Sequence, residues 1–374
     1  MTAPFIQPLR ATLRLQFHKG FTLDQAVPLV PYFARLGISH VYASPLLAAR
    51  AGSMHGYDVV DPTTVNPELG GEAALRRLVK ALREQQMGLI LDIVSNHMAV
   101  GGADNPWWLD LLEWGRLSPF GEFFDIQWHS PDPLMEGQLL LPFLGSDYGI
   151  ALQDGTLPLR FDAQGGSFYV QHYDHRFPIC PMHYGELLPT DGEQLKSLAE
   201  RFTTLSYQTH AHSLAVPLKA ELRDLASDPV QRQSIEQHLG SYDSLTPDGF
   251  QRLHNLLERQ SYRLASWRTA ADDINCGVFS MSTNWAACAS SGPPCSKPPT
   301  QKYSSWWRKG WWTVYASTTS TASPIPVATV ANCDAGSITC HRAGTCLSTS
   351  RRSSAKAKLC TATGRWTALP VTSS

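Results

Sequence analysis

Three features are missing from this sequence of 374 residues, and each absence narrows its function. No run approaches 18 consecutive apolar residues, which argues against a membrane-spanning helix. The formal net charge of −1 shows no basic excess, which argues against a nucleic-acid binder. The first residues lack the charged-then-apolar layout of a secretory signal peptide. We therefore expect a cytoplasmic protein that contacts neither membrane nor nucleic acid.

Acidic residues are nearly missing from the last 99 positions, 276–374, where Asp334 is the only one against ten lysines and arginines. The body, residues 1–275, holds 21 basic and 31 acidic residues, so a body of net charge −10 carries a tail of net charge +9. The tail also holds seven of the eight cysteines, six of the eleven tryptophans and 31 serines and threonines. Body and tail therefore need separate interpretations.

The first part of the body alternates predicted strands and helices. Residues 12–17 (TLRLQF) and 39–44 (SHVYAS) have strand-like composition, and 89–94 (LILDIV) is the nearly apolar run typical of a buried parallel strand. Strand, helix, strand, helix, strand with short links indicates a parallel sheet covered by helices. An open doubly wound sheet and a (β/α)8 TIM barrel both fit this order. No glycine-rich phosphate loop follows the first strand, which counts against a dinucleotide-binding fold.

Two helices are predicted between these strands. The first begins at a capping box formed by Thr22 and Gln25, and Pro28 and Pro31 predict that it bends or begins late. The second follows Gly71. Its expected buried face consists of Leu75, Leu78, Val79 and Leu82.

The alternation stops after about residue 104, and residues 105–250 are predicted to be a largely helical insertion. Trp107 and Trp108 within it are better explained by core packing than by a sugar-stacking role. An amphipathic stretch, 253–268, is expected to lead back to a strand beginning near Ile274. The predicted divisions are the first βα units of the barrel at 1–104, the insertion at 105–250, the return to the barrel at 251–275 and an irregular or disordered tail at 276–374.

Polar residues follow two of the predicted strands, at the strand ends where (β/α)8 enzymes carry their chemistry. Asp92 lies within an apolar run, so its carboxylate needs a partner, which in a purely structural role is the backbone or an arginine. Asn96 and His97 are equally consistent with a turn and a core imidazole. Tyr57 is either an ordinary half-buried aromatic or a platform for a sugar ring.

The body resembles the maltooligosyl trehalose synthase family of the α-amylase superfamily over essentially all of residues 1–275. The segment DIVSNH (92–97) matches the first motif shared by that superfamily and is moderately specific. HGYDVVDP (55–62), combined with 262–275, is more specific for the synthase. The other similar segments are TLRLQFHKGFTLDQA (12–26), LGISHVYASPLLAARAGSM (36–54), NPELGGE (66–72), GLIL (88–91), MAV (98–100), HYDHRFP (172–178) and LLERQS (256–261).

The resemblance implies a (β/α)8 barrel that converts the reducing-end α-1,4 link of a maltooligosaccharide or glycogen-derived glucan into an α,α-1,1 link. It implies that Tyr57 stacks on the reacting glucose, that His97 binds its hydroxyls and that Asp92 holds an arginine beside the nucleophile. Asn96 would support the base of the same substrate site, and His55 belongs to the same substrate-binding motif. No cofactor is implied, and no oxygen-ligand cluster typical of a calcium loop is found. The neighbouring enzyme in the pathway would be a maltooligosyl trehalose trehalohydrolase.

The tail is best explained as another reading frame of the same gene. If one nucleotide was lost near Cys276, each intended codon consists of the last base of one written codon and the first two of the next. Residues 276–291 then permit RRFFDVNELGCLRVE, which continues the family sequence, and 294–311 permit an amphipathic helix. Shifted reading of a GC-rich gene also explains a tail that is rich in Ser, Thr, Arg, Trp and Cys.

The same shift restores two catalytic motifs. Residues 313–322 permit GLRVDHVDG, which is similar to the superfamily motif with the nucleophilic Asp, whose codon would straddle codons 317–318. Residues 347–354 permit IYVEKIL, which is similar to the motif with the acid Glu, straddling codons 350–351. As written, the chain contains neither carboxyl group, so we expect no catalytic residue in it and no activity.

The tail and the chain as a whole also admit alternatives. The tail could be a disulfide module, although its cysteine count is odd, or a zinc site, although its cysteines lack ligand spacing. Its tryptophans and basic residues could form a membrane or nucleic-acid patch. Its composition also fits disorder. The whole chain could be a non-catalytic glucan-binding remnant or another amylase-type hydrolase.

Overall fold

The computed structural model of the protein describes residues 8–94, 97–130 and 132–276, together with the backbone of five short strands further along the chain. The chain divides into two units, the first formed by Met1–Ser95 with Ser296–Ser374 and the second by Asn96–Cys295. The five strands are β12 (Trp285–Ala287), β13 (Val314–Ser317), β14 (Ala328–Ala331), β15 (Ala357–Cys360) and β16 (Trp366–Leu369). The rest of the predicted irregular tail lies outside the described residues.

A parallel sheet forms the centre of the first unit. Its strands β1 (Thr12–Leu15), β2 (His40–Ala43) and β5 (Gly88–Asp92) lie side by side in that order, all parallel. β13 continues the sheet parallel to β5, and β14 pairs antiparallel with β13. All five residues of β5 are buried, as the apolar run in the sequence predicts. The expected parallel strands of a barrel are therefore present.

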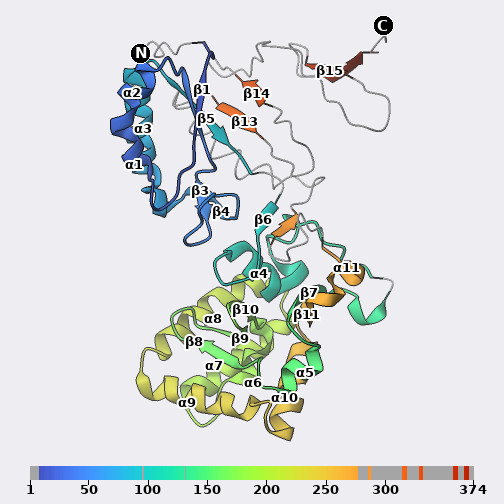
Figure 1. The fold of residues 1–374 in the computed structure, drawn as a ribbon. Coiled ribbons are helices and arrows are strands. Elements are labelled where there is room, and N and C mark those ends of the chain that lie inside the picture. The colour runs from blue at the N-terminus through green and yellow to red at the C-terminus, as the bar shows by residue number, and fades with distance from the viewer. Residues whose placement is uncertain are drawn as a thin grey trace. The chain divides into compact units, whose positions relative to one another are not determined.

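The helices of this unit lie on one side of the sheet (Figure 1). The first predicted helix is three pieces, α1 (Leu23–Ala26), the 3-10 turn η1 (Val27–Leu29) and α2 (Val30–Arg35). Each break precedes a proline. Proline lacks the N–H that continues a helix, but it is tolerated in the first turn of the next helical piece. At the start, Thr22 N donates to Gln25 Oε1 at 2.7 Å, which is one half of the predicted capping box.

The second helix, α3 (Gly71–Glu84), is an amphipathic helix with the expected face in the core. The predicted residues Leu75, Leu78, Val79 and Leu82 are all buried. They share one core with the inner side chains of the strands, among them Val41, Ala43, Leu89 and Leu91. The strand residues that alternate with these inner ones point to the opposite face of the sheet.

That opposite face is polar towards the carboxyl ends of the strands. Arg14 of β1 is in register with Tyr42 of β2, and Tyr42 is in register with Ile90 of β5. Asp92 follows two positions later on the same face. Beside these ends, β3 (Leu47–Ala49) and β4 (Val59–Val65) pair antiparallel and carry between them the loop with Tyr57.

The second unit contains the insertion, which is largely helical and also carries a small sheet. Its sheet β8–β9–β10 is antiparallel and was not expected from the sequence. In β9, Phe168, Val170 and His172 are buried and alternate with half-buried residues, which is strand periodicity. The elements are α4 (Pro106–Trp114), β7 (Leu139–Leu144), α5 (Tyr148–Gln153), β8 (Leu159–Asp162), β9 (Ser167–His172), β10 (His175–Pro178), α6 (Tyr184–Leu187), α7 (Glu193–Thr204), α8 (Ala211–Leu225), α9 (Pro229–Leu239) and α10 (Pro247–Glu258).

The return from the insertion corrects one expectation. The predicted amphipathic stretch 253–268 is not one element, because α10 ends at Glu258 and β11 (Tyr262–Ser266) follows. In β11 the buried residues alternate with half-buried ones, and the strand pairs parallel with β7. Ile274 lies after this strand and does not begin one. The leucines before residue 258 have helical spacing, so the sequence did not reveal that the burial pattern alternates from Tyr262 onward.

Candidate functional site

Asp92, at the carboxyl end of β5, is the centre of the polar cluster in the first unit. The residue is 1% exposed, and its Oδ2 accepts hydrogen bonds from Tyr42 OH at 2.9 Å and Tyr57 OH at 2.6 Å. Within the described residues its partners are therefore two tyrosine hydroxyls, neither the backbone nor an arginine. Its other oxygen, Oδ1, is buried without a hydrogen-bond partner in the described part of the chain. That oxygen is an open acceptor at the strand end, where ligand sites of barrels form.

Tyr57 reaches Asp92 from a tightly built loop. Gly56 has φ +77°, and a Cβ on it would lie 2.6 Å from the Pro45 carbonyl oxygen, so only glycine fits there. Gly56 N donates to Ser53 Oγ at 3.1 Å, and Ser53 Oγ in turn donates to Asp58. Burial, followed by the hydrogen bond to Asp92, raises the pKa of Tyr57 to about 12. The hydroxyl therefore stays protonated and can donate.

His55 lies in the same loop with a partly exposed ring. Tyr57 N donates to His55 Nδ1 at 3.0 Å, so that nitrogen is an acceptor and the proton of a neutral ring lies on Nε2. His55 Nδ1 lies 3.6 Å from Asp58 Oδ1, which is beyond hydrogen-bond distance. The centroids of the His55 and Tyr57 rings are 5.9 Å apart. The structure thus brings together three of the predicted residues, His55, Tyr57 and Asp92.

The two other predicted residues, Asn96 and His97, belong to the second unit. His97 belongs to the second unit, where it begins β6 (His97–Ala99), is 3% exposed and pairs with Ala287 of β12. Asn96 lies outside the described residues. The substrate-binding roles of His97 and Asn96 stay predictions.

Three members of the cluster were missed by the sequence reasoning. Tyr42 supplies one of the two hydroxyls on Asp92, and its ring lies 5.8 Å from the Arg14 guanidinium carbon. Arg14 Nη2 donates to Tyr57 OH at 3.3 Å, and Gln16 accepts from Arg14 Nη1 at 2.9 Å. The sequence feature that could have revealed them is the alternation in TLRLQF, which places Arg14 and Gln16 on one face of the strand. In a parallel sheet that face is normally apolar.

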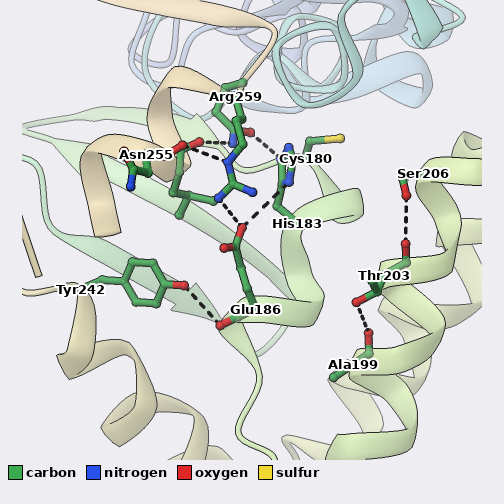
Figure 2. A network of polar contacts seen from close by, with 11 residues as sticks. Cys180, His183, Glu186, Ala199, Thr203, Ser206, Tyr242, Asn255 and Arg259 are labelled. Atoms are coloured by element: carbon green, nitrogen blue, oxygen red, sulfur yellow. Dashed lines mark hydrogen bonds and ion pairs between the residues drawn. The ribbon is translucent and has the colours of Figure 1, made fainter. Parts of the chain in front are cut away.

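A second polar cluster, in the second unit, has a structural role, because it links elements that are distant in the sequence. Figure 2 shows Glu186 of α6 accepting from Arg259 Nη2, at 2.6 Å, and its backbone oxygen accepting from Tyr242 OH, at 3.2 Å. His183 Nδ1 lies 3.9 Å from Glu186 Oε1, but burial and then Arg259 lower the pKa of His183, which keeps it neutral. These groups satisfy one another and tie α6 to the end of α10.

The aromatic residues Trp107 and Trp108 are packed into the core of the second unit. They are 9% and 2% exposed, and they contact Phe120 and Phe124 respectively. Core packing is thus their role, as expected. Among the described residues, no group of three or more His, Cys, Asp or Glu side chains is placed to hold a metal ion. No helix in the same part of the chain is long and apolar enough to cross a membrane.

Comparison with known proteins identifies the class. Residues 25–172 match the family model of the alpha amylase catalytic domain. Together with the parallel sheet and the polar groups at its carboxyl ends, this match shows that the N-terminal part has the fold of the first βα units of an amylase-type (β/α)8 barrel.

Within that class, the N-terminal part is similar to maltooligosyl trehalose synthases. It is 49% identical to a putative maltooligosyl trehalose synthase of Mycobacterium tuberculosis (strain ATCC 25618 / H37Rv) over 153 residues. This aligned region covers 40% of this chain and 20% of that protein. The structure of maltooligosyltrehalose synthase from Arthrobacter ramosus is similar with a TM-score of 0.56 and 29% identity, covering 83% of this chain and 31% of that one. An intracellular maltogenic amylase of Bacillus subtilis is 32% identical over 107 residues, covering 29% of this chain and 17% of that protein. The chain spans less than a third of each relative.

Proposed function

We propose that this chain is the N-terminal part of a maltooligosyl trehalose synthase followed by a frameshifted tail. The family reaction would be an intramolecular transglucosylation that turns the reducing-end α-1,4 link of a maltooligosaccharide into an α,α-1,1 link. The proposal rests chiefly on one observation, the buried Asp92 carboxylate held by Tyr42 and Tyr57 at the carboxyl ends of the sheet. The similarity to the Mycobacterium tuberculosis and Arthrobacter ramosus proteins supports it.

The site residues would bind and orient the sugar without performing the chemistry. Tyr57 would present its ring to a glucose unit, and His55 would offer a ring nitrogen to a hydroxyl. The open Oδ1 of Asp92 would accept a hydrogen bond from an arginine beside the nucleophile, in a complete enzyme. His97 would bind hydroxyls and Asn96 would support the base of the substrate site. The substrate would be a maltooligosaccharide or a glycogen-derived glucan.

The chain as written would not catalyse this reaction. A retaining transglucosylation needs one carboxylate to attack the anomeric carbon and one carboxylic acid to protonate the leaving oxygen, about 5–5.5 Å apart. Both groups would come from later strands, and the tail offers only Asp334. Loss of both groups removes the covalent route.

The register of β13 supports the frameshift. This strand lies parallel to β5, and Ser317 is in register with Asp92. The shifted reading of 313–322 is the strand motif GLRVDHVDG, with its Asp on codons 317–318. The altered tail would therefore still occupy the place of the next barrel strand. Sequencing the gene across codons 275–277 tests this directly, and an intact sequence relative to close relatives would contradict it.

A non-catalytic glucan-binding remnant is the second candidate, and one observation favours it. His55, Tyr57 and Asp92 are assembled although the catalytic carboxyl groups are missing. Calorimetric titration with maltopentaose tests it, since no tryptophan precedes Trp107 and fluorescence would not report on this loop. Binding that is lost in Tyr57→Ala and retained in the matched surface variant Tyr173→Ala would support it. Release of glucose or maltose from the glucan would instead indicate an amylase-type hydrolase.

The proposal also assigns a cellular setting from the resemblance. The complete enzyme would work in the cytoplasm on glycogen-derived glucans. Its product, a glucan ending in a non-reducing α,α-1,1 link, would be the substrate of a maltooligosyl trehalose trehalohydrolase. Accumulation of the glucan with the α,α-1,1 link when the trehalohydrolase gene is deleted would test this pairing.

A further inference from the structure

We propose that Arg14 and Gln16 are positioning residues of the glucan site. They would hold the loop 53–58 against β1 and direct the hydroxyl of Tyr57 towards Asp92. The inference rests on the proposed function for the identity of the ligand, a neutral maltooligosaccharide, but the positioning role stands on contacts within the chain.

Arg14 sets the direction of the Tyr57 hydroxyl. Arg14 Nη2 donates to Tyr57 OH at 3.3 Å, and Tyr57 OH donates to Asp92 Oδ2 at 2.6 Å. A guanidinium has donors and no acceptor, so the phenol oxygen must accept from Arg14, and its single proton is left for Asp92. The bond from Arg14 is long, so its direct contribution is small. Its effect is mainly to select one orientation of the hydroxyl.

Gln16 joins this chain of hydrogen bonds to the loop backbone. Gln16 Oε1 accepts from Arg14 Nη1 at 2.9 Å, while Gln16 Nε2 donates to the Met54 carbonyl at 2.8 Å. One amide therefore fixes both the guanidinium and the loop that carries Tyr57. Because Gln16 directly follows β1, the loop is anchored to the end of a rigid element, which is what precise ligand geometry requires.

The placement of these residues is unusual for a parallel strand. Leu13 and Leu15 pack against the core of the unit, whereas Arg14 and Gln16, which alternate with them, are exposed. Strands of parallel sheets are normally apolar on both faces. Neither Arg14 nor Gln16 contributes to the core, so the polar pair is explained by what it holds at the strand end.

The first test uses hydrogen–deuterium exchange of the peptide covering residues 53–58 in the full chain. Arg14→Ala and Gln16→Ala are expected to raise its exchange rate about fivefold, because each removes a hydrogen bond of roughly 1 kcal/mol. Arg14→Lys should recover part of the protection, since an ammonium can replace one donor but not the planar fork. The matched control Arg35→Ala changes an exposed arginine on α2 and should leave the loop unaffected. Unchanged exchange in Arg14→Ala overturns the proposal, whatever the ligand does.

The second test measures maltopentaose affinity by calorimetry. Arg14→Ala is expected to weaken binding about fivefold, and Arg14→Ala added to Tyr57→Phe should cost little more than Tyr57→Phe alone, because Arg14 acts through that hydroxyl. Additive losses would show that Arg14 contacts the sugar itself and would overturn the positioning role. If the wild-type chain binds no glucan, the proposed function fails and the role towards sugar fails with it, while the exchange experiment still decides the anchoring of the loop.

Discussion

Asp92 shows what a buried carboxyl group costs a strand. The side chain is 1% exposed within an otherwise apolar strand, and only one of its oxygens is hydrogen-bonded among the described residues. A buried polar atom without a partner costs about 1–3 kcal/mol. The two tyrosine hydroxyls on Oδ2 offset part of the cost of burying this carboxylate. This local cost is best explained by a ligand or partner group that the oxygen accepts from.

Tyr57 gives a pH-dependent prediction. Its pKa is raised to about 12 from an ordinary value of 10, first by burial and then by the Asp92 bond. The folded protein thus holds this proton more tightly than the unfolded chain, so the stabilisation is complete below pH 10 and is lost as the pH rises towards 12. Discounted for partial exposure, the loss is about 1 kcal/mol.

When the pH rises from about 9 to about 11.5, the free energy of unfolding should therefore fall less in the Tyr57→Phe variant than in the wild type. Urea denaturation at the two pH values measures this. The other buried tyrosines titrate in both proteins and cancel in the comparison. Equal pH dependence in the two proteins would contradict the raised pKa of Tyr57.

Gly56 gives a prediction with a matched control. An alanine Cβ there would lie 2.6 Å from the Pro45 oxygen, in addition to the strain of φ +77°. Gly56→Ala should destabilise the protein by about 2 kcal/mol and weaken maltopentaose binding by roughly tenfold, because the loop must move Tyr57 away from Asp92. Gly37 has φ +82° but nothing within 4 Å of its Cβ position. Gly37→Ala should cost about 1 kcal/mol and leave affinity unchanged. Similar affinities in the two variants would refute the clash.

The candidate site was predictable only where one segment carries the signal. Asp92 stands out because a charge interrupts an apolar run, and Tyr57 because its motif is specific. Tyr42 and Arg14 were missed because their role depends on register between neighbouring strands, which brings Arg14 opposite Tyr42. A sequence alone does not supply that register. The tyrosine partners of Asp92 were missed for the same reason.

At the scale of elements, α4 and α8 are joined by a buried ion pair. Glu113 of α4 is 6% exposed, and its Oε1 accepts from Lys219 Nζ of α8 at 2.7 Å and from Tyr184 OH at 3.2 Å. Its Oε2 accepts from Trp114 Nε1 at 2.9 Å. Every oxygen of this carboxylate is thus satisfied, unlike those of Asp92. Full satisfaction is expected of a group that holds two helices together.

Glu113→Ala should destabilise the second unit by about 3 kcal/mol, because it leaves the Lys219 ammonium and two aromatic donors without their acceptor. The double variant Glu113→Gln with Lys219→Met should cost only about 1 kcal/mol, since it removes both charges and keeps the amide as an acceptor. Chemical denaturation followed by tryptophan fluorescence, to which the adjacent Trp114 contributes, compares them. A double variant as unstable as the single one would show that packing, not charge, joins the helices.

Elements were predictable where one periodicity runs without interruption. α3 has five buried residues at helical spacing, and β5 is continuous apolar sequence between glycine and the polar end. β11 was hidden because leucines at helical spacing lead into it, and only the pairing with β7 makes Tyr262 and Leu264 strand residues. The β8–β10 sheet was missed because its strands are short and antiparallel, within a region whose helices dominate the pattern.

At the scale of the whole molecule, two observations matter: the composition changes near residue 276, and the chain covers only part of each relative. The chain covers 20% of the Mycobacterium tuberculosis protein and 31% of the Arthrobacter ramosus structure. The shift from a net charge of −10 to +9 falls near Cys276, where the predicted frame changes. The proposed loss of a nucleotide would explain the changed composition, the motifs in the shifted frame and a β13 register that places Ser317 opposite Asp92.

Restoring the reading frame is the decisive experiment at this scale. Insertion of one base at the Cys276 codon should yield a protein that converts maltopentaose into a product with a non-reducing end, detected as loss of reducing sugar without release of glucose. The chain as written should show no turnover above background, because it lacks both carboxyl groups that the covalent mechanism needs.

The control is the restored gene with the Asp of the GLRVDHVDG motif changed to Asn, which should lower the rate by at least about a thousandfold while retaining glucan binding through Tyr57. Retained binding shows that the variant is folded, so loss of rate reports on the nucleophile alone. A restored protein that binds glucan but leaves its reducing end unchanged would reject the synthase and favour the binding remnant. Turnover by the chain as written would contradict the frameshift, because it would require a catalytic pair elsewhere in the sequence.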